Sequence, residues 1–311
     1  MIKVALVAMS GEWFFSDAQS KSEIVREHLT LITRFDPWDS GLCTCPAKLT
    51  LNPYTGCDHS CIYCYAAGYI PNFSTCRPKT NLIQRLRKEA SRLKGEIISL
   101  SNSSDPYPQI EAETELTRNC LQILSEQNCR IQIITKSDIV TRDVDLLAKV
   151  PSVVSLTITT DDDRIAELIE PRAPPPSARL AAVEALASKN VPVVVRVDPL
   201  IPSVNDNPET LIDKLASLGV QQVTVSTLKV DRRIFSRIKA RLPEVSATLE
   251  PLYFEQGDRI GRYTYLPKAM RLQMLEKVKS LTEKQSMKFG VCREGLSSLS
   301  TALCDGSWLL S

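Results

Sequence analysis

The stretch GCDHSCIYCYA, residues 56–66, places three cysteines within eight positions. Cys57, Cys61 and Cys64 follow the spacing C-x-x-x-C-x-x-C. Grouped cysteines typically bind zinc or iron–sulfur clusters, and both kinds of site usually take four protein ligands. A cubane cluster held by only three thiolates keeps one iron free for a ligand that is not protein. The spacing therefore indicates a metal-binding loop and favours an iron–sulfur cluster with an open iron.

A zinc loop is the alternative interpretation of the same motif. Zinc would need a fourth ligand, for which Cys43, Cys45 and His59 are the candidates. Cys43 and Cys45 form a CTC pair just before the first expected strand, and this pair could reach an auxiliary metal. Two ligands do not make a site, and the sequence leaves open whether this pair, Cys292 and Cys304 bind a second metal.

The composition is that of an ordinary globular protein. The chain has 311 residues, 43% of them hydrophobic, and a net charge of +2, which neither demands nor excludes a nucleic-acid partner. Its ten cysteines are unevenly placed, which favours metal binding over disulfides. No run approaches the roughly 18 apolar residues of a membrane span, and MIKVALVAM (1–9) is too short for a signal sequence. We therefore expect a cytoplasmic protein with reduced thiols and no membrane partner.

Short Val- and Ile-rich runs alternate with segments of helical spacing from residue 48 onward. The runs predicted to be parallel strands, buried on both faces, are residues 48–53, 96–101, 131–135, 153–159, 191–197 and 220–226. Such alternation predicts an α/β fold with right-handed crossovers, and six strands are too few to close an eight-stranded barrel. The expected fold is a partial, open (βα)6 barrel of the TIM type, with its active site at the carboxyl ends of the strands.

The chain is expected to divide into three parts. Residues 1–44 are an N-terminal extension, residues 45–230 are the barrel core with the loop 56–66, and residues 231–311 are a helical capping region. EPRAPPPS (170–177) is expected to be a stiff, extended connection. DRRIFSRIKARL (231–242) places basic side chains on an expected helix, where they either grip phosphates or form a solvated face.

Four stretches carry a resemblance to a known family: NPYTGCDHSCIYCYA (52–66), SNSSDPYPQIEAETELTR (101–118), ITKSDIVTRDVDLL (134–147) and EPRAPPPSARL (170–180). They resemble the spore photoproduct lyase-like family of the radical S-adenosylmethionine (SAM) superfamily. The resemblance implies that Cys57, Cys61 and Cys64 ligate a [4Fe–4S] cluster whose free iron chelates SAM. It further implies that the reduced cluster cleaves SAM to a 5′-deoxyadenosyl radical, which abstracts a hydrogen atom from a substrate.

The resemblance also implies roles for residues near the methionine end of SAM. Ser104 and Asp105 would hold its amino group, and Lys136 would pair with its carboxylate. Thr157 stands where the family has a serine near the same group. Each has a simpler interpretation, because Ser104 and Asp105 precede Pro106 and could cap a turn. Lys136 could equally be a solvated charge, and Thr157 an ordinary β-branched strand residue.

Two tyrosines and one asparagine bear on the reaction. Tyr63 and Tyr65 match tyrosines that flank the third cluster cysteine of the lyase, so both are candidate catalytic residues, and Tyr63 is also a candidate cofactor contact. The lyase has a hydrogen-donating cysteine three residues before its match to Asp105, where this chain has Asn102. An amide cannot donate a hydrogen atom as a thiol does, so the resemblance implies the radical-generating machinery rather than the lyase reaction. Another thiol could replace that donor, and the candidates are Cys43, Cys45, Cys292 and Cys304.

By analogy with the family, the expected substrate is a nucleic acid or a nucleotide. The expected partners are SAM and a one-electron donor of the flavodoxin or ferredoxin type. A peptide or a small metabolite is an alternative substrate, because a fold does not determine its substrate. A non-catalytic zinc-binding protein is the alternative from another class.

Overall fold

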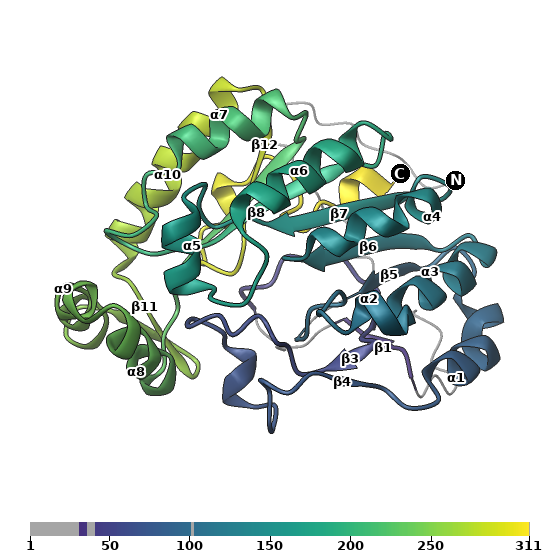
Figure 1. The fold of residues 1–311 in the computed structure, drawn as a ribbon. Helices are drawn as coiled ribbons and strands as arrows, with labels where there is room; N and C mark the ends of the chain where they lie inside the picture. Colours follow the sequence, from purple (N-terminus) through teal and green to yellow (C-terminus); the bar gives the residue numbers. More distant parts are fainter. Residues whose placement is uncertain (1–30, 36–40, 101–102, 311) are drawn as a thin grey trace, which may run out of the picture.

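The computed structural model describes residues 31–35, 41–100 and 103–310. Within these ranges the centre is an eight-stranded sheet in the order β1-β2-β5-β6-β7-β8-β9-β12 (Figure 1). β1 pairs antiparallel with β2, and all other neighbouring strands are parallel. The strands are β1 (Thr33–Arg34), β2 (Leu49–Leu51), β5 (Ile97–Leu100), β6 (Arg130–Thr135), β7 (Ser152–Thr157), β8 (Val193–Leu200), β9 (Gln222–Thr227) and β12 (Lys288–Val291).

Two small antiparallel sheets and the helices complete the described chain. The small sheets pair β3 (Tyr54–Thr55) with β4 (Arg77–Pro78) and β10 (Asp258–Ile260) with β11 (Tyr263–Tyr265). The α-helices are α1 (Leu82–Glu89), α2 (Glu111–Thr114), α3 (Leu116–Glu126), α4 (Val144–Leu147), α5 (Asp163–Ile169), α6 (Pro176–Ala187), α7 (Glu209–Ser217), α8 (Arg232–Arg241), α9 (Pro243–Phe254) and α10 (Lys268–Lys284). The 3₁₀ helices are η1 (Ala66–Gly68), η2 (Ala90–Leu93), η3 (Asp138–Asp143), η4 (Ser297–Leu299) and η5 (Ser307–Leu310).

All six predicted strands are present, and the predicted α/β partial barrel is confirmed. The strand β12 was not predicted from the sequence; it adds a further parallel strand beside β9 from within the expected capping region. Its sequence, KFGV, is short and contains a glycine, so its strand signal is weak. The expected extended connection at 170–177 is wrong at its end, because Pro176 already begins α6. Proline fits there because its fixed φ suits the first helical position.

Helices cover one face of the large sheet (Figure 1). α3, α6, α7 and α10 each bury one apolar stripe, represented by Leu121, Val183, Leu211 and Val278, in the same hydrophobic core as the strands. Parallel strands need such cover because both of their faces are apolar and must leave water. None of the helices in the described ranges is long and apolar enough to span a membrane.

The C-terminal tail packs against polar side chains of the strands. Gln132 Nε2 in β6 donates to Asp305 O (2.5 Å), and Thr224 Oγ1 in β9 donates to Cys304 O (2.7 Å). The buried ammonium of Lys48 pairs with the Asp305 carboxylate and donates to Gln132 Oε1 at 2.7 Å. These bonds satisfy polar groups that would otherwise be buried without partners, so they fix the tail at one place inside the fold.

A second hydrophobic cluster joins α8, α9 and β11 to the cysteine loop. Ile62 of the loop packs in the same cluster as Ile234 and Phe235 of α8 and Tyr263 of β11. Ile169, the last residue of α5, belongs to this cluster too. The C-terminal helices therefore support the loop directly.

Candidate active site

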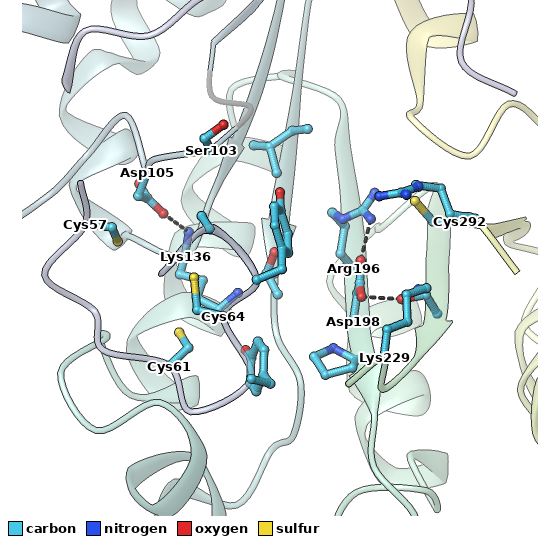
Figure 2. A pocket seen from close by; sticks show the side chains of 18 of the residues that line it. Cys57, Cys61, Cys64, Ser103, Asp105, Lys136, Arg196, Asp198, Lys229 and Cys292 are labelled. Atoms are coloured by element: carbon cyan, nitrogen blue, oxygen red, sulfur yellow. Dashed lines mark hydrogen bonds and ion pairs between the residues drawn. The ribbon is translucent and has the colours of Figure 1, made fainter. Parts of the chain in front are cut away.

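A pocket of about 300 Å³ lies at the carboxyl ends of the parallel strands (Figure 2). The cysteine loop lines one side, and residues at the ends of β8 and β9 and after β12 line the opposite side. All of the site residues expected from the sequence line this one pocket: Cys57, Cys61, Tyr63, Cys64, Tyr65, Ser104, Asp105, Lys136 and Thr157. Asn102 lies outside the described residues.

Backbone hydrogen bonds hold the cysteine loop in place. The amide of Cys57 donates to Phe73 O (2.8 Å), and the amide of Ile62 donates to Ile169 O (3.0 Å). Gly56 enters the loop with φ of +84°, and a Cβ there would lie 2.5 Å from a backbone oxygen. Only glycine fits this close approach in the left-handed region, which explains why the cysteine motif begins with a glycine.

Two arginines of α8 also grip this part of the chain. Arg237 Nε donates to Ile62 O at 2.9 Å, and Arg237 Nη2 donates to Cys64 O. Arg233 Nη1 donates to Gly68 O at 2.9 Å. This role differs from both sequence interpretations of the basic segment, because these two side chains bind backbone carbonyls of the protein itself.

Burial keeps the thiols of Cys57 and Cys61 protonated in the metal-free protein. It raises the pKa of Cys61 to about 12. Burial, with the nearby Asp105 carboxylate, also raises the pKa of Cys57. Since thiolates are the metal ligands, metal binding at this loop must release protons.

The spacing of the loop sulfurs distinguishes the two metals considered. Four sulfurs around one zinc at 2.3 Å would lie about 3.8 Å apart. Among the described residues, the group of ligand atoms mutually within 4.8 Å is that of Cys57, Asp58 and His59, so the three loop sulfurs are spread more widely. The three loop sulfurs are therefore not grouped as closely as the ligands of a single zinc ion. Cys43 and Cys45 contact Cys304 or each other rather than acting as a fourth ligand to the loop.

Asp105 ties several elements together at the pocket. Its Oδ1 accepts from Thr135 Oγ1 (2.6 Å) and Tyr107 N (2.9 Å), and its Oδ2 accepts from Lys136 N (2.8 Å; dashed in Figure 2). His59 Nδ1 lies 3.6 Å from Oδ2. The bond to the Tyr107 amide shows that Asp105 caps the turn at Pro106. A carboxylate has about four acceptor positions, so Asp105 can still accept from a bound ammonium group.

Glu170 is a buried carboxylate that the sequence analysis missed. Arg179 Nη1 lies 2.5 Å from its Oε2, the Tyr63 hydroxyl donates to its Oε1, and Lys136 Nζ lies 3.9 Å from Oε1. Burial alone would raise the pKa of Glu170, but the charges of Arg179 and Lys136 outweigh it and lower the pKa to about 2. Lys136 is therefore a partly buried, ion-paired cation, and its interpretation as a solvated charge is wrong. In the sequence, this ion pair could have been suspected from Glu170 and Arg179, which lie on either side of the proline stretch.

The opposite side of the pocket carries a second charged network. Arg196 Nη2 lies 2.5 Å from Asp198 Oδ2, and Lys229 Nζ lies 3.0 Å from Glu294 Oε1. Burial raises the pKa of Asp198, but Arg196 and Lys229 dominate and lower it to about 2. Arg293 lines the same pocket. Charged residues at the end of the apolar strand β8 were the signal for this network.

A family model described as the Radical SAM superfamily matches residues 51–234. The match covers more than half of the chain, which therefore belongs to the radical SAM superfamily. The protein is a radical SAM enzyme, and its cofactors are a [4Fe–4S] cluster and SAM. The superfamily predicted from the cysteine loop is confirmed.

Related proteins are similar over most of the chain. The uncharacterized protein Rv2578c of Mycobacterium tuberculosis is 30% identical over 261 residues, which are 77% of this chain and 75% of that protein. The uncharacterized protein MJ0683 of Methanocaldococcus jannaschii is 34% identical over 167 residues, which are 51% of this chain and 63% of that protein.

Solved structures share the fold at low identity. A mutant of spore photoproduct lyase with bound AdoMet and dinucleoside spore photoproduct aligns with a TM-score of 0.59 and 17% identity, covering 78% of this chain and 74% of the other. Streptococcus suis SuiB bound to S-adenosylmethionine aligns with a TM-score of 0.51 and 13% identity, covering 78% of this chain and 49% of the other. Their likeness supports the partial-barrel fold.

Proposed function

We propose that Cys57, Cys61 and Cys64 hold the [4Fe–4S] cluster and that the enzyme removes a hydrogen atom from a nucleic acid or a nucleotide. When bound, the reduced cluster and SAM supply a 5′-deoxyadenosyl radical that abstracts hydrogen. The protein's part is to hold both cofactors and the substrate in one geometry and to exclude water.

The ligand set is supported by where the other pocket cysteines lie. Cys43, Cys45, Cys292 and Cys304 contact one another in a separate group. The loop therefore offers three thiolates to a cluster that takes four ligands, which leaves one position for SAM.

The neighbouring polar residues suit a methionine head group. Ser104, Asp105 and Thr157 supply acceptors that line the pocket, and Lys136 supplies a compact cation. Glu170 is already paired with Arg179, so Lys136 can turn from Glu170 to a ligand carboxylate without leaving a buried charge alone. We propose that Lys136 does so when SAM binds.

The two candidate catalytic tyrosines differ in their hydrogen bonding and in their exposure to solvent. The Tyr63 hydroxyl donates to Glu170, so this hydroxyl is already used in a structural hydrogen bond. Tyr65 is 38% exposed and its ring stacks on Tyr69 with centroids 6.3 Å apart. We propose that Tyr63 positions the cofactor site and that Tyr65 faces the substrate.

The observation that carries the substrate class is this aromatic pair together with three basic side chains of the charged network across the pocket. Tyr65 and Tyr69 offer exposed ring faces beside the last cluster cysteine, and Arg196, Lys229 and Arg293 line the pocket. Aromatic faces stack bases, and basic side chains bind phosphates. A nucleotide carries both a base and a phosphate. A peptide or a small metabolite need not contain both of these groups.

The reaction we propose differs from that of spore photoproduct lyase. Asn102 occupies the position of the hydrogen-donating cysteine in the resemblance, and an amide cannot return a hydrogen atom. The enzyme also needs one electron per SAM cleaved, for which we propose a donor of the flavodoxin or ferredoxin type.

The test is anaerobic turnover of the reconstituted, reduced enzyme with SAM and defined substrate classes. Deuterated oligonucleotides should stimulate 5′-deoxyadenosine formation and transfer deuterium into it, as detected by mass spectrometry. Deuterated peptides should do neither. Stimulation by peptides alone would overturn the nucleic-acid substrate and leave the SAM chemistry intact. Repair of ultraviolet-damaged DNA at ordinary lyase rates would show that Asn102 does not preclude that reaction.

A further inference from the structure

Four cysteines outside the cysteine loop meet on one side of the pocket. Cys43 and Cys45 precede β2, Cys292 directly follows β12, and Cys304 lies in the C-terminal tail. All four line the same pocket as the loop cysteines. We call these four residues the tail-side cysteines, after Cys304 of the C-terminal tail. Cys43 and Cys45 belong to the group, although they lie in the N-terminal part of the chain.

The tail-side thiols form a continuous row. Cys43 lies close enough to Cys45, Cys45 to Cys304, and Cys304 to Cys292 for each pair of thiols to interact. Thr44 Oγ1 lies 3.9 Å from Cys304 Sγ. None of the four is in a disulfide. Four free thiols that converge from distant segments match the number and kind of ligands that a closed metal centre takes.

The scaffold holds these cysteines at fixed positions. The amide of Cys292 donates to Val225 O (2.9 Å), which continues the ladder of the parallel sheet. Cys304 O accepts from Thr224 Oγ1, and the next residue, Asp305, forms the buried ion pair with Lys48. A Cβ on Gly290 would lie only 2.8 Å from Cys304 Cα, so a glycine is needed for the tail to come this close.

Three cations lie beside the row, and each is also paired with a carboxylate: Arg196 with Asp198, Lys229 with Glu294 and Lys48 with Asp305. The Arg196 guanidinium lies beside Cys292 (Figure 2) and interacts with it. Lys48 and Lys229 lie near enough to act on the charges of Cys45 and Cys292. A centre with four thiolates carries net negative charge, so such neighbours would stabilise it.

The spacing favours a cluster over a single ion. Four sulfurs on one zinc would lie about 3.8 Å apart. In the described chain, no three sulfurs of the tail-side group belong to a set of ligand atoms mutually within 4.8 Å. The three loop cysteines are spread in the same way. The row is therefore more open than the tetrahedron of sulfurs that one zinc ion binds.

We propose that Cys43, Cys45, Cys292 and Cys304 bind a second iron–sulfur cluster, which shares the pocket with the SAM-binding cluster. Because it has four thiolate ligands, its irons are all coordinated by protein and by sulfide. The second cluster therefore does not bind SAM.

The test uses a chain that cannot build the first cluster. The triple variant Cys57→Ala, Cys61→Ala, Cys64→Ala retains every tail-side ligand. After anaerobic reconstitution with iron and sulfide it should bind up to about four irons, about half of what the wild type binds. Iron, sulfide and zinc analysis and the electron paramagnetic resonance spectrum of the reduced protein supply the readout. A triple variant that binds one zinc ion, or no metal, would overturn the second cluster.

The reverse variant controls for folding. Cys45→Ser with Cys304→Ser should lose about half of the wild-type iron and retain the spectrum of the SAM-binding cluster. Cys76→Ser, which removes a cysteine outside both groups, should bind as much iron as the wild type. A Cys45→Ser, Cys304→Ser variant that is folded by circular dichroism and retains all of its iron would contradict the proposal. Because these readouts are metal content and spectra, they do not depend on the substrate proposed above.

Discussion

The two groups of cysteines that face the pocket are built in opposite ways. Cys57, Cys61 and Cys64 lie within eight positions of one loop, so a local turn brings them together. The tail-side cysteines lie between residues 43 and 304, so they meet only after the parallel sheet has formed and the tail has packed against it. The first group is encoded by local spacing, whereas the second is encoded by long-range packing.

The contacts that hold the two groups in place show the same contrast between local and long-range interactions. Backbone hydrogen bonds and Arg237 hold the loop through its own carbonyls and amides. The tail depends on buried side chains, above all the pair between Lys48 and Asp305, whose side chains are 0% and 4% exposed. Changes at the loop should therefore affect cofactor chemistry first, and changes at the tail should affect stability as well.

The largest expected effect is on the loop. Cys61→Ala leaves two ligands for the SAM-binding cluster, so 5′-deoxyadenosine formation should fall to background. The tail-side cluster should still form in this variant, which separates the two groups in one protein. Chromatography of the products and iron analysis provide the measurement. Cleavage of SAM by Cys61→Ala would show that the ligand assignment is wrong, and Cys76→Ser serves as the matched control.

The same contrast explains what the sequence could predict. The loop spacing predicted the superfamily, and Val- and Ile-rich runs predicted the six strands, because both signals are local. β12 was missed because its four residues have little strand propensity. The sequence around Cys304 contains no pattern that predicts hydrogen bonds from Gln132, Gln222 and Thr224 to the tail. The polar residues within otherwise apolar strands did indicate that these strands have polar partners.

The site shows a similar limit. Asp105 and Lys136 were placed correctly in the pocket, because both follow strands whose carboxyl ends meet. Their partners were not predictable in this way. Glu170 and Arg179 lie nine positions apart on either side of a proline stretch, and only the packing of α5 against α6 turns them into a buried pair. Pairing of this kind depends on tertiary geometry, which local patterns do not contain.

The second expected effect tests the tail. Asp305→Asn removes the charge that compensates the buried Lys48 ammonium. An uncompensated buried charge typically costs about 3–5 kcal/mol, so the free energy of unfolding of the metal-free protein should fall by about that amount. Urea denaturation followed by circular dichroism measures it. Glu113→Gln, an exposed acid on α2, should change stability by less than about 0.5 kcal/mol. Equal effects in both variants would mean that the tail is not held by this pair.

The third expected effect is the pH dependence of stability that Glu170 causes. This residue lies on the side of the pocket formed by the cysteine loop. Its folded pKa of about 2 lies below its ordinary value of 4.5, so Glu170 contributes stability above pH 4.5. That contribution, about 3 kcal/mol, is lost as pH falls from about 4.5 towards 2. The metal-free wild type should therefore lose stability over this range more steeply than Glu170→Gln does. Glu167→Gln, at an exposed position in α5, the helix that ends just before Glu170, should keep the wild-type slope. An unchanged slope in Glu170→Gln would contradict the depressed pKa.

The smallest expected effect refines how the loop is held. Arg237→Gln removes the donors to Ile62 O and Cys64 O, although the three proposed cluster ligands are unchanged. Loss of such a supporting contact typically weakens metal binding about 10-fold or more, so the SAM-binding cluster should be lost about 10 times faster to an iron chelator. The tail-side cluster should be lost at the wild-type rate, because Arg237 does not line that side of the pocket. Arg241→Gln removes an exposed arginine from the end of the same helix and should change neither rate. If Arg237→Gln releases both clusters equally fast, the two sides of the pocket are not independent, and the contrast between local and long-range assembly fails.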